Sequence, residues 1–135
     1  MIQARCVCGG VTVNLSSRSL DVVACHCLDC QRRTGSPFGV GAYYPDDAVS
    51  SSGQVTEFVR PTAAGGEFRS SFCSVCGTSV YWTTSGKPGM VGIAVGTLAD
   101  PNYPAPVSSL WERSKHAWTS IDTAVEHLPR GWGRY

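Results

Sequence analysis

The sequence contains no long hydrophobic run, because no apolar stretch approaches the roughly 20 residues that a membrane-spanning helix needs. It also lacks the charged segment followed by an apolar segment that opens a secretory signal peptide. We therefore expect a cytoplasmic protein without a membrane partner. Thiols in the cytosol stay reduced, so close cysteine pairs in such a chain indicate metal ligands or redox centres rather than structural disulfides.

The sequence also lacks an excess of charge of one sign. Eleven basic and ten acidic residues leave a net charge of +1, and the basic residues are scattered from Arg5 to Arg134 without forming a stripe. Nucleic-acid binding usually depends on clustered lysine and arginine side chains. We therefore predict no nucleic-acid partner and expect a small-molecule ligand instead.

Long helical patterns are scarce as well, since only residues 28–34 suggest a short helical turn. The chain of 135 residues suits one compact domain, and its 15 glycines and 8 prolines indicate many turns. We predict an all-β or β-dominated α+β domain. Strands are expected over residues 10–15, 20–24, 38–44, 55–59, 67–72, 79–84 and 90–98.

The sequence shows no internal domain boundary, repeat or low-complexity tract, so residues 1–135 are expected to form a single domain. Residues 61–66 are a loop by composition, and the proline-rich residues 101–106 are a linker or extended arm. The C-terminal tail, residues 110–135, is expected to pack on the body. Its Trp111 and Trp118 are expected in the core, together with Trp82.

Seven cysteines are present, and all of them fall into three close groups. A closed structural zinc site takes four ligands in a tetrahedron, whereas a catalytic site uses three protein ligands and keeps one position open. We expect the two pairs that lie far apart in the sequence to complete a closed site together, and the three cysteines that lie within six residues to hold an open one. The groups are Cys6 and Cys8, then Cys25, Cys27 and Cys30, then Cys73 and Cys76.

Counting alone leaves other arrangements possible. The pair Cys6 and Cys8 could combine with two cysteines of the middle group instead. A histidine or a carboxylate could close the second site, so that all seven cysteines serve folding only. Thiolate-rich sites also suit iron–sulfur clusters. A thioredoxin-like redox role is disfavoured, because the sequence lacks the βαβ context of that motif.

A zinc ion held by three thiolates is electron-rich and therefore a poor Lewis acid. Such an ion favours a soft fourth ligand, and a substrate thiolate is one. A sulfur bound in that way is ionised at neutral pH, where a free thiol with a pKa of about 8.5 mostly is not. The ligand type therefore predicts activation of a substrate thiol for attack on an electrophile.

Four motifs together resemble the glutathione-dependent formaldehyde-activating enzymes, to which centromere protein V is related. They are C-x-C-G-G-V at residues 6–11, C-H-C-x-x-C-x-R at 25–32, T-G-S-P-F at 34–38 and F-C-x-x-C-G-T at 72–78. The resemblance implies a β-tent fold of short strands, and an activity that joins formaldehyde to glutathione. It implies that Cys6, Cys8, Cys73 and Cys76 hold a structural zinc, and that Cys25, Cys27 and Cys30 hold a catalytic zinc.

Several other residues are candidates for binding the substrate. Arg32 could pair with a substrate carboxylate, and Arg33 is a weaker candidate for the same role. Gly35, Ser36 and Phe38 could line the mouth of the site, although a simple turn leading into a buried strand also explains them. Three histidines are expected to be structural or exposed, with a packed or hydrogen-bonded role favoured for the first. They are His26, His116 and His127.

The sequence as a whole predicts a zinc-dependent carbon–sulfur lyase that acts on an adduct of a thiol with a small aldehyde. Two alternatives remain at this level: a zinc-dependent hydrolase that uses the same open site, and a non-catalytic zinc-binding interaction module. A solvent-accessible pocket beside Cys25, Cys27 and Cys30 would favour either enzyme. A fourth protein ligand there, or a large exposed apolar patch, would favour the interaction module.

Overall fold

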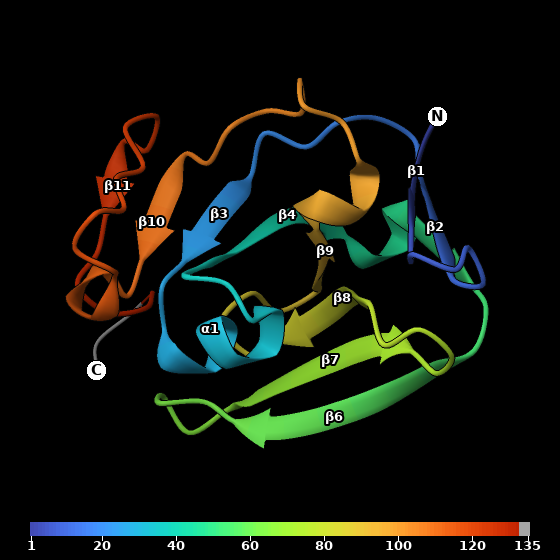
Figure 1. The fold of residues 1–135 in the computed structure, drawn as a ribbon, viewed down its shortest axis with the longest axis horizontal. Helices are drawn as coiled ribbons and strands as arrows, with labels where there is room; N and C mark the ends of the chain where they lie inside the picture. Colours follow the sequence, from blue (N-terminus) through green and yellow to red (C-terminus); the bar gives the residue numbers. More distant parts are fainter. Residues whose placement is uncertain (133–135) are drawn as a thin grey trace.

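A computed structural model describes residues 1–132 of the chain. Within these residues, eleven short strands, one α-helix and three 3₁₀ helices form a mainly β fold (Figure 1). The large sheet has, in spatial order, β11 (Glu126–His127), β10 (Ser108–Leu110), β3 (Val22–Cys25), β4 (Gly39–Pro45), β9 (Met90–Ala94), β8 (Ser79–Thr84), β7 (Glu67–Cys73) and β6 (Val55–Pro61). The small sheet has β1 (Ile2–Arg5), β2 (Thr12–Leu15) and β5 (Val49–Ser52). The helices are α1 (Leu28–Thr34), η1 (Asp46–Ala48), η2 (Val95–Leu98) and η3 (Glu112–Ser114).

The prediction of a mainly β fold of short antiparallel strands with little helix is confirmed. One edge of the large sheet departs from it, because β10 runs parallel to both β3 and β11. Four strands were not predicted, namely β1, β5, β10 and β11, and each has only two to four residues. The strand expected over 90–98 ends at Ala94, where the chain continues as η2.

The main hydrophobic core lies between the two sheets. Alternating residues of the strands contribute fully buried side chains to it, among them Val13, Leu15, Val80 and Ile93. Burying each of these side chains stabilises the fold by about 1.5–3 kcal/mol. Across residues 1–132, no helix has both the length and the hydrophobicity to span a bilayer.

A second core cluster surrounds Trp82 on β8, which is 4% exposed. Its indole packs over two glycines of the same sheet, Gly41 on β4 and Gly92 on β9. A Cβ atom would come within 2.4 Å of the ring at Gly41 and within 2.3 Å of it at Gly92. Glycine inside a strand often marks such a close approach. The glycines in β4 and β9 therefore make room for Trp82, which was expected in the core. Trp118, expected there too, is 73% exposed, so that expectation was wrong.

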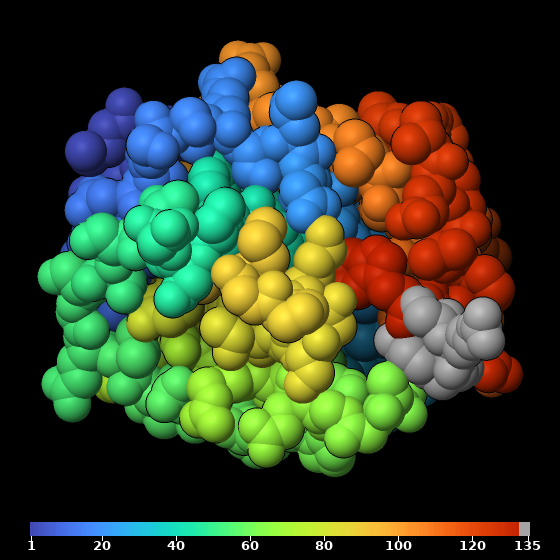
Figure 2. Space-filling view, turned by 180° about the vertical axis from the view of Figure 1, so that it is seen from behind, coloured from blue at the N-terminus to red at the C-terminus, as the bar shows by residue number. Residues whose placement is uncertain are grey.

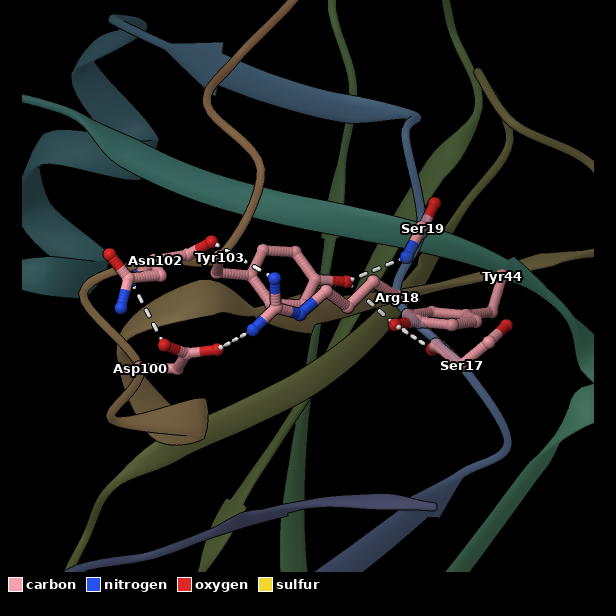
Figure 3. Close-up of polar contacts among 7 residues, drawn as sticks. All are labelled: Ser17, Arg18, Ser19, Tyr44, Asp100, Asn102 and Tyr103. Atoms are coloured by element: carbon pink, nitrogen blue, oxygen red, sulfur yellow. Dashed lines mark hydrogen bonds and ion pairs between the residues drawn. The ribbon is translucent and has the colours of Figure 1, made fainter.

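Polar contacts fasten the loop before β3 to the segment that follows η2 (Figure 3). The hydroxyl groups of Tyr44 and Tyr103, both on buried side chains, lie 2.6 Å apart, and the amide of Ser19 donates to Tyr103 Oη at 2.9 Å. Arg18 pairs with Asp100 at 2.7 Å in the same region. Because buried hydroxyls need partners, this network fixes how the two segments meet.

The C-terminal segment, residues 108–132, adds β10 and β11 to the edge of the sheet next to β3 (Figure 1). Leu128 and Trp132 then pack against the cluster around Trp82. The last three residues of the predicted tail, 133–135, lie outside the described residues.

Candidate metal centres and the adjoining cavity

The first candidate metal centre is a four-cysteine cluster, formed by Cys6, Cys8, Cys73 and Cys76. Their four Sγ atoms lie within 4.8 Å of one another, although the two pairs are far apart in the sequence. The Sγ atoms of Cys6 and Cys8 are 3.6 Å apart, and those of Cys8 and Cys73 are 3.7 Å apart. A tetrahedron with Zn–S bonds of about 2.3 Å has sulfur atoms about 3.8 Å apart. The cluster therefore fits a closed tetrahedral metal site.

Tight turns place these sulfurs, and each turn needs a glycine. Gly9 and Gly77 have φ angles of +81° and +78°, and their amides donate to the carbonyls of Cys6 and Cys73 at 3.1 and 2.9 Å. Residues with a side chain rarely adopt such positive φ angles. The amide of Val11 donates to Cys6 Sγ at 3.2 Å, which supplies the N–H···S contact that favours a thiolate.

The second candidate centre is a three-cysteine cluster, formed by Cys25, Cys27 and Cys30. Cys25 ends β3, Cys27 is the N-cap of α1, and Cys30 lies one turn into that helix. Their Sγ atoms lie within 4.8 Å of one another. Within the described part of the chain, no further cysteine, histidine or carboxylate joins this group. The cluster thus offers three ligands on one side of a metal and leaves a position for another ligand.

Contacts among the three thiols lower the pKa of Cys27 and raise those of Cys25 and Cys30. Hydrogen bonds from the thiols of Cys25 and Cys30 lower the pKa of Cys27 to about 2. The amide of Cys30 also donates to Cys27 Sγ at 3.2 Å. The same contact with Cys27 raises the pKa of Cys25. These contacts favour the thiolate form at Cys27 over that at Cys25, and metal binding would release the protons that the thiols still hold.

The backbone between the cysteines is held by the C-terminal segment. The carbonyl of His26 accepts hydrogen bonds from Gln31 Nε2 at 2.9 Å and from Ser114 Oγ at 2.8 Å. The His26 ring is fully buried and contacts Ser109 Oγ through Nε2 at 2.9 Å, and burial lowers its pKa. The favoured packed and hydrogen-bonded role of His26 is what the structure shows. These bonds explain how a short loop keeps three sulfurs together.

A cavity of about 820 Å³ opens beside the three-cysteine cluster, and we call it the main cavity. Figure 2 shows a recess on this face, between the C-terminal segment in red, the β8–β9 connection in yellow and the β6–β7 turn in light green. The three cysteines lie in its wall. Its aromatic lining consists of Tyr43, Phe68, Trp82, Trp111 and Trp132, and its charged lining of Asp29, Arg33, Arg60 and Arg113.

Two side chains build the wall of the main cavity that is shared with the core. The guanidinium of Arg33 lies over the Trp82 ring, 4.4 Å from its centroid, and donates to Ser79 Oγ at 2.9 Å. The indole Nε1 of Trp82 in turn donates to the hydroxyl of Tyr43 at 3.0 Å. This wall combines an apolar surface with a fixed positive charge close to the sulfurs.

The predicted substrate-binding residues lie at different places. Arg32 is exposed, and Arg33, the weaker candidate, lines the main cavity instead. Gly35 and Ser36 are exposed at the end of α1 and are absent from the lining of the main cavity. Phe38 lies 5.4 Å from the His26 ring and lines a second cavity of about 680 Å³.

Sequence reasoning missed Arg60, Phe68 and Trp132 as residues of the site. They lie on β6, on β7 and in the C-terminal segment, far along the chain from α1. None of them belongs to a cysteine motif, so spacing gave no signal. Only the assembled sheet brings them to the same cavity.

Comparison with known proteins identifies the family of the chain. The family model described as glutathione-dependent formaldehyde-activating enzyme matches residues 1–114. No curated protein matches the chain significantly. The crystal structure of a protein from Rhodobacter sphaeroides superposes with a TM-score of 0.59 and 17% sequence identity, covering 94% of this chain and 99% of that one, and so shares its fold. The match over residues 1–114 shows that this chain belongs to the glutathione-dependent formaldehyde-activating enzyme family.

Proposed function

We propose that the protein is a zinc-dependent carbon–sulfur lyase. Its reaction joins or separates a thiol, glutathione or a similar one, and a small aldehyde such as formaldehyde. One observation carries this proposal: three cysteines with no further ligand in the described residues open into the main cavity. The volume of that cavity falls within the range of about 300–1,000 Å³ that is usual for small-molecule sites. A cavity at this place supports an enzyme rather than an interaction module.

The residues present fit two zinc ions. The four-cysteine cluster would hold a structural ion, because its sulfur distances match a closed tetrahedron. The residues Cys25, Cys27 and Cys30 would hold the second ion. When bound there, zinc supplies a position for a soft ligand and so keeps a substrate thiol ionised at neutral pH.

The reaction itself needs few groups from the protein. The substrate sulfur forms a bond to the carbonyl carbon while the C=O electron pair moves onto the oxygen. The proton that the thiol gives up is balanced by the proton that this oxygen gains, and the reverse reaction restores both. The protein contributes binding and orientation, which account for a large part of the rate enhancement in two-substrate reactions. Phe68 and Trp82 give the cavity an aromatic wall, which would keep water away from a substrate bound against it.

The nature of the ligands favours the lyase over a hydrolase. Three thiolates supply three negative charges, so a metal at this place acidifies a bound water less than it would with three histidines. Arg33, held over Trp82, and Arg60 add positive charge along the cavity. Positive charge attracts an anionic thiol such as glutathione, and the hydrolysis of a neutral ester or amide has no need of it.

The test is to measure, by NMR magnetisation exchange, how fast glutathione exchanges between its free and hydroxymethyl forms. We expect the protein to accelerate the exchange and Cys27→Ser to abolish the acceleration while keeping one zinc in the four-cysteine cluster. Arg32→Met serves as the matched control, because this exposed arginine lies outside the lining of the main cavity. A protein that holds two zinc ions and accelerates nothing would refute the proposal.

A further inference from the structure

One arginine of the main cavity has only loose polar contacts. The Nη1 atom of Arg60 lies 3.4 Å from Asp29 Oδ2 and 3.3 Å from the carbonyl of Pro61. Charge-assisted N–H···O⁻ bonds are normally about 2.7–2.9 Å long. Within residues 1–132, the guanidinium of Arg60 therefore has no acceptor at such a short distance. Its N–H groups are available to donate to an acceptor that comes closer.

Arg60 is nevertheless held in place. It lies directly across from Phe68 in the β6–β7 pair, and its guanidinium stacks 4.5 Å from the centroid of that ring. Its side chain is only 20% exposed. Stacking on an aromatic face fixes the plane of a guanidinium while leaving its edge free to donate hydrogen bonds. Arg60 is thus a preorganised donor on the wall of the cavity that also contains Cys27.

The other charged residues of the cavity are less suited to this role. Arg33 is already engaged by Ser79 and Trp82. Arg113 is exposed on η3, where a charge pair is largely screened by solvent. Asp29, the present partner of Arg60, has a side chain that is 54% exposed, so water can solvate its carboxylate when it leaves the pair.

We propose that Arg60 forms a carboxylate-binding subsite for the thiol substrate, and that the ligand carboxylate replaces Asp29 as the partner of its guanidinium. The identity of the thiol rests on the proposed function, because glutathione carries two carboxylates. A bidentate arginine–carboxylate pair fixes both the position and the orientation of the ligand. The subsite would make the enzyme selective for acidic thiols over neutral ones.

The test uses a ligand that cannot place a thiolate on a metal. S-methylglutathione keeps both carboxylates and has a blocked sulfur, and its diethyl ester lacks the carboxylate charges. Binding of each is measured by isothermal titration calorimetry to the zinc-loaded wild type and to Arg60→Met, in which an apolar side chain still covers Phe68. We expect Arg60→Met to weaken S-methylglutathione about ten-fold and to leave the diester unchanged, because only the free carboxylates make a charged hydrogen bond.

The matched control is Arg69→Met. Arg69 lies on β7 across from Val59, so its side chain projects from the face of the hairpin opposite to Arg60. It contacts Glu57 and Glu67 at 3.8 Å each and is absent from the lining of the main cavity. We expect Arg69→Met to bind both ligands as the wild type does. If both arginine variants bound S-methylglutathione equally weakly, the loss would come from the overall charge of the protein, and the subsite would be overturned.

A second variant tests the exchange of partners. If Asp29 competes with the ligand carboxylate, Asp29→Asn binds S-methylglutathione about two- to three-fold more tightly, as expected for a half-exposed ion pair. Weaker binding would mean that Asp29 positions Arg60 and stays in place, and would overturn the exchange. Arg60→Lys keeps the charge without the fork, so we expect it to recover only part of the lost affinity.

The outcomes separate this inference from the proposed function. Accelerated hydroxymethyl exchange in the wild type, with equal binding of S-methylglutathione to wild type and Arg60→Met, would overturn the subsite and leave the lyase. If the wild type does not accelerate hydroxymethyl exchange, while Arg60→Met binds S-methylglutathione ten-fold more weakly than the wild type and binds the diester equally well, the lyase is overturned and the carboxylate subsite remains. Zinc content, measured for every variant, ensures that a loss of binding comes from Arg60 and not from a lost metal.

Discussion

Replacing Gly41 by alanine tests whether Trp82 organises the centre of the protein. A Cβ atom at this position would lie 2.4 Å from Trp82 Cζ2 and 3.0 Å from Cη2. Carbon atoms in contact are about 3.5–4.0 Å apart, so the indole would have to move by about 1 Å or more. Such a movement would disturb the stacking of Trp82 on Phe68 and the hydrogen bond from its Nε1 to Tyr43. Overpacking of this kind costs about 3 kcal/mol.

The assay is thermal and urea unfolding of the zinc-loaded protein. A loss of about 3 kcal/mol in a chain of this size corresponds to a fall in Tm of about 10 °C. Gly96→Ala is the control, because a Cβ atom there meets nothing within 4 Å and the residue has no positive φ. In a Trp82→Phe background, where Cζ2 and Cη2 are absent, we expect Gly41→Ala to cost less than about 1 kcal/mol. If Gly41→Ala were as mild as Gly96→Ala, the ring of Trp82 would not be what requires glycine at position 41.

Two further predictions concern the four-cysteine cluster and a surface pair. Cys73→Ser should reduce the bound zinc from two ions to one and lower the free energy of unfolding by several kcal/mol, because metal binding at the four-cysteine cluster is coupled to folding. Metal analysis together with thermal unfolding checks this prediction. An unchanged Tm would contradict it. The hydrogen bond with Glu112, 2.7 Å from His127 Nδ1, raises the pKa of His127. Glu112→Gln should therefore return that pKa towards its ordinary value of 6.5 in an NMR titration. In the wild type, the stabilisation from this pair is complete between pH 4.5 and pH 6.5, the ordinary pKa values of Glu112 and His127. It is lost as the pH rises through the raised pKa of His127 and as the pH falls through the lowered pKa of Glu112. An equal His127 pKa in both proteins would refute the role of Glu112.

The sequence alone determined the features that depend on neighbours along the chain. The turns around Cys6 and Cys73 bring two sulfurs together within a few residues, and the following glycines supply positive φ, so the spacing of the motifs already indicates half of a metal site. The short helix at residues 28–34 and most of the strands follow from local pattern for the same reason. The family resemblance rests on these local motifs, and the family match now supports it.

The tertiary structure decided the features that depend on long-range packing. Counting could not show which cysteine pairs meet, because Cys8 and Cys73 are 65 residues apart in the sequence and only folding brings their Sγ atoms to 3.7 Å. Whether Arg32 or Arg33 faces the cavity depends on how α1 is rotated against β4, and adjacent helical residues point about 100° apart. Arg60 and Trp132 reach the cavity only through the β6–β7 pairing and the addition of the C-terminal segment to the sheet. Local spacing therefore specifies the ligands, whereas the assembled sheet specifies the cavity in which they act.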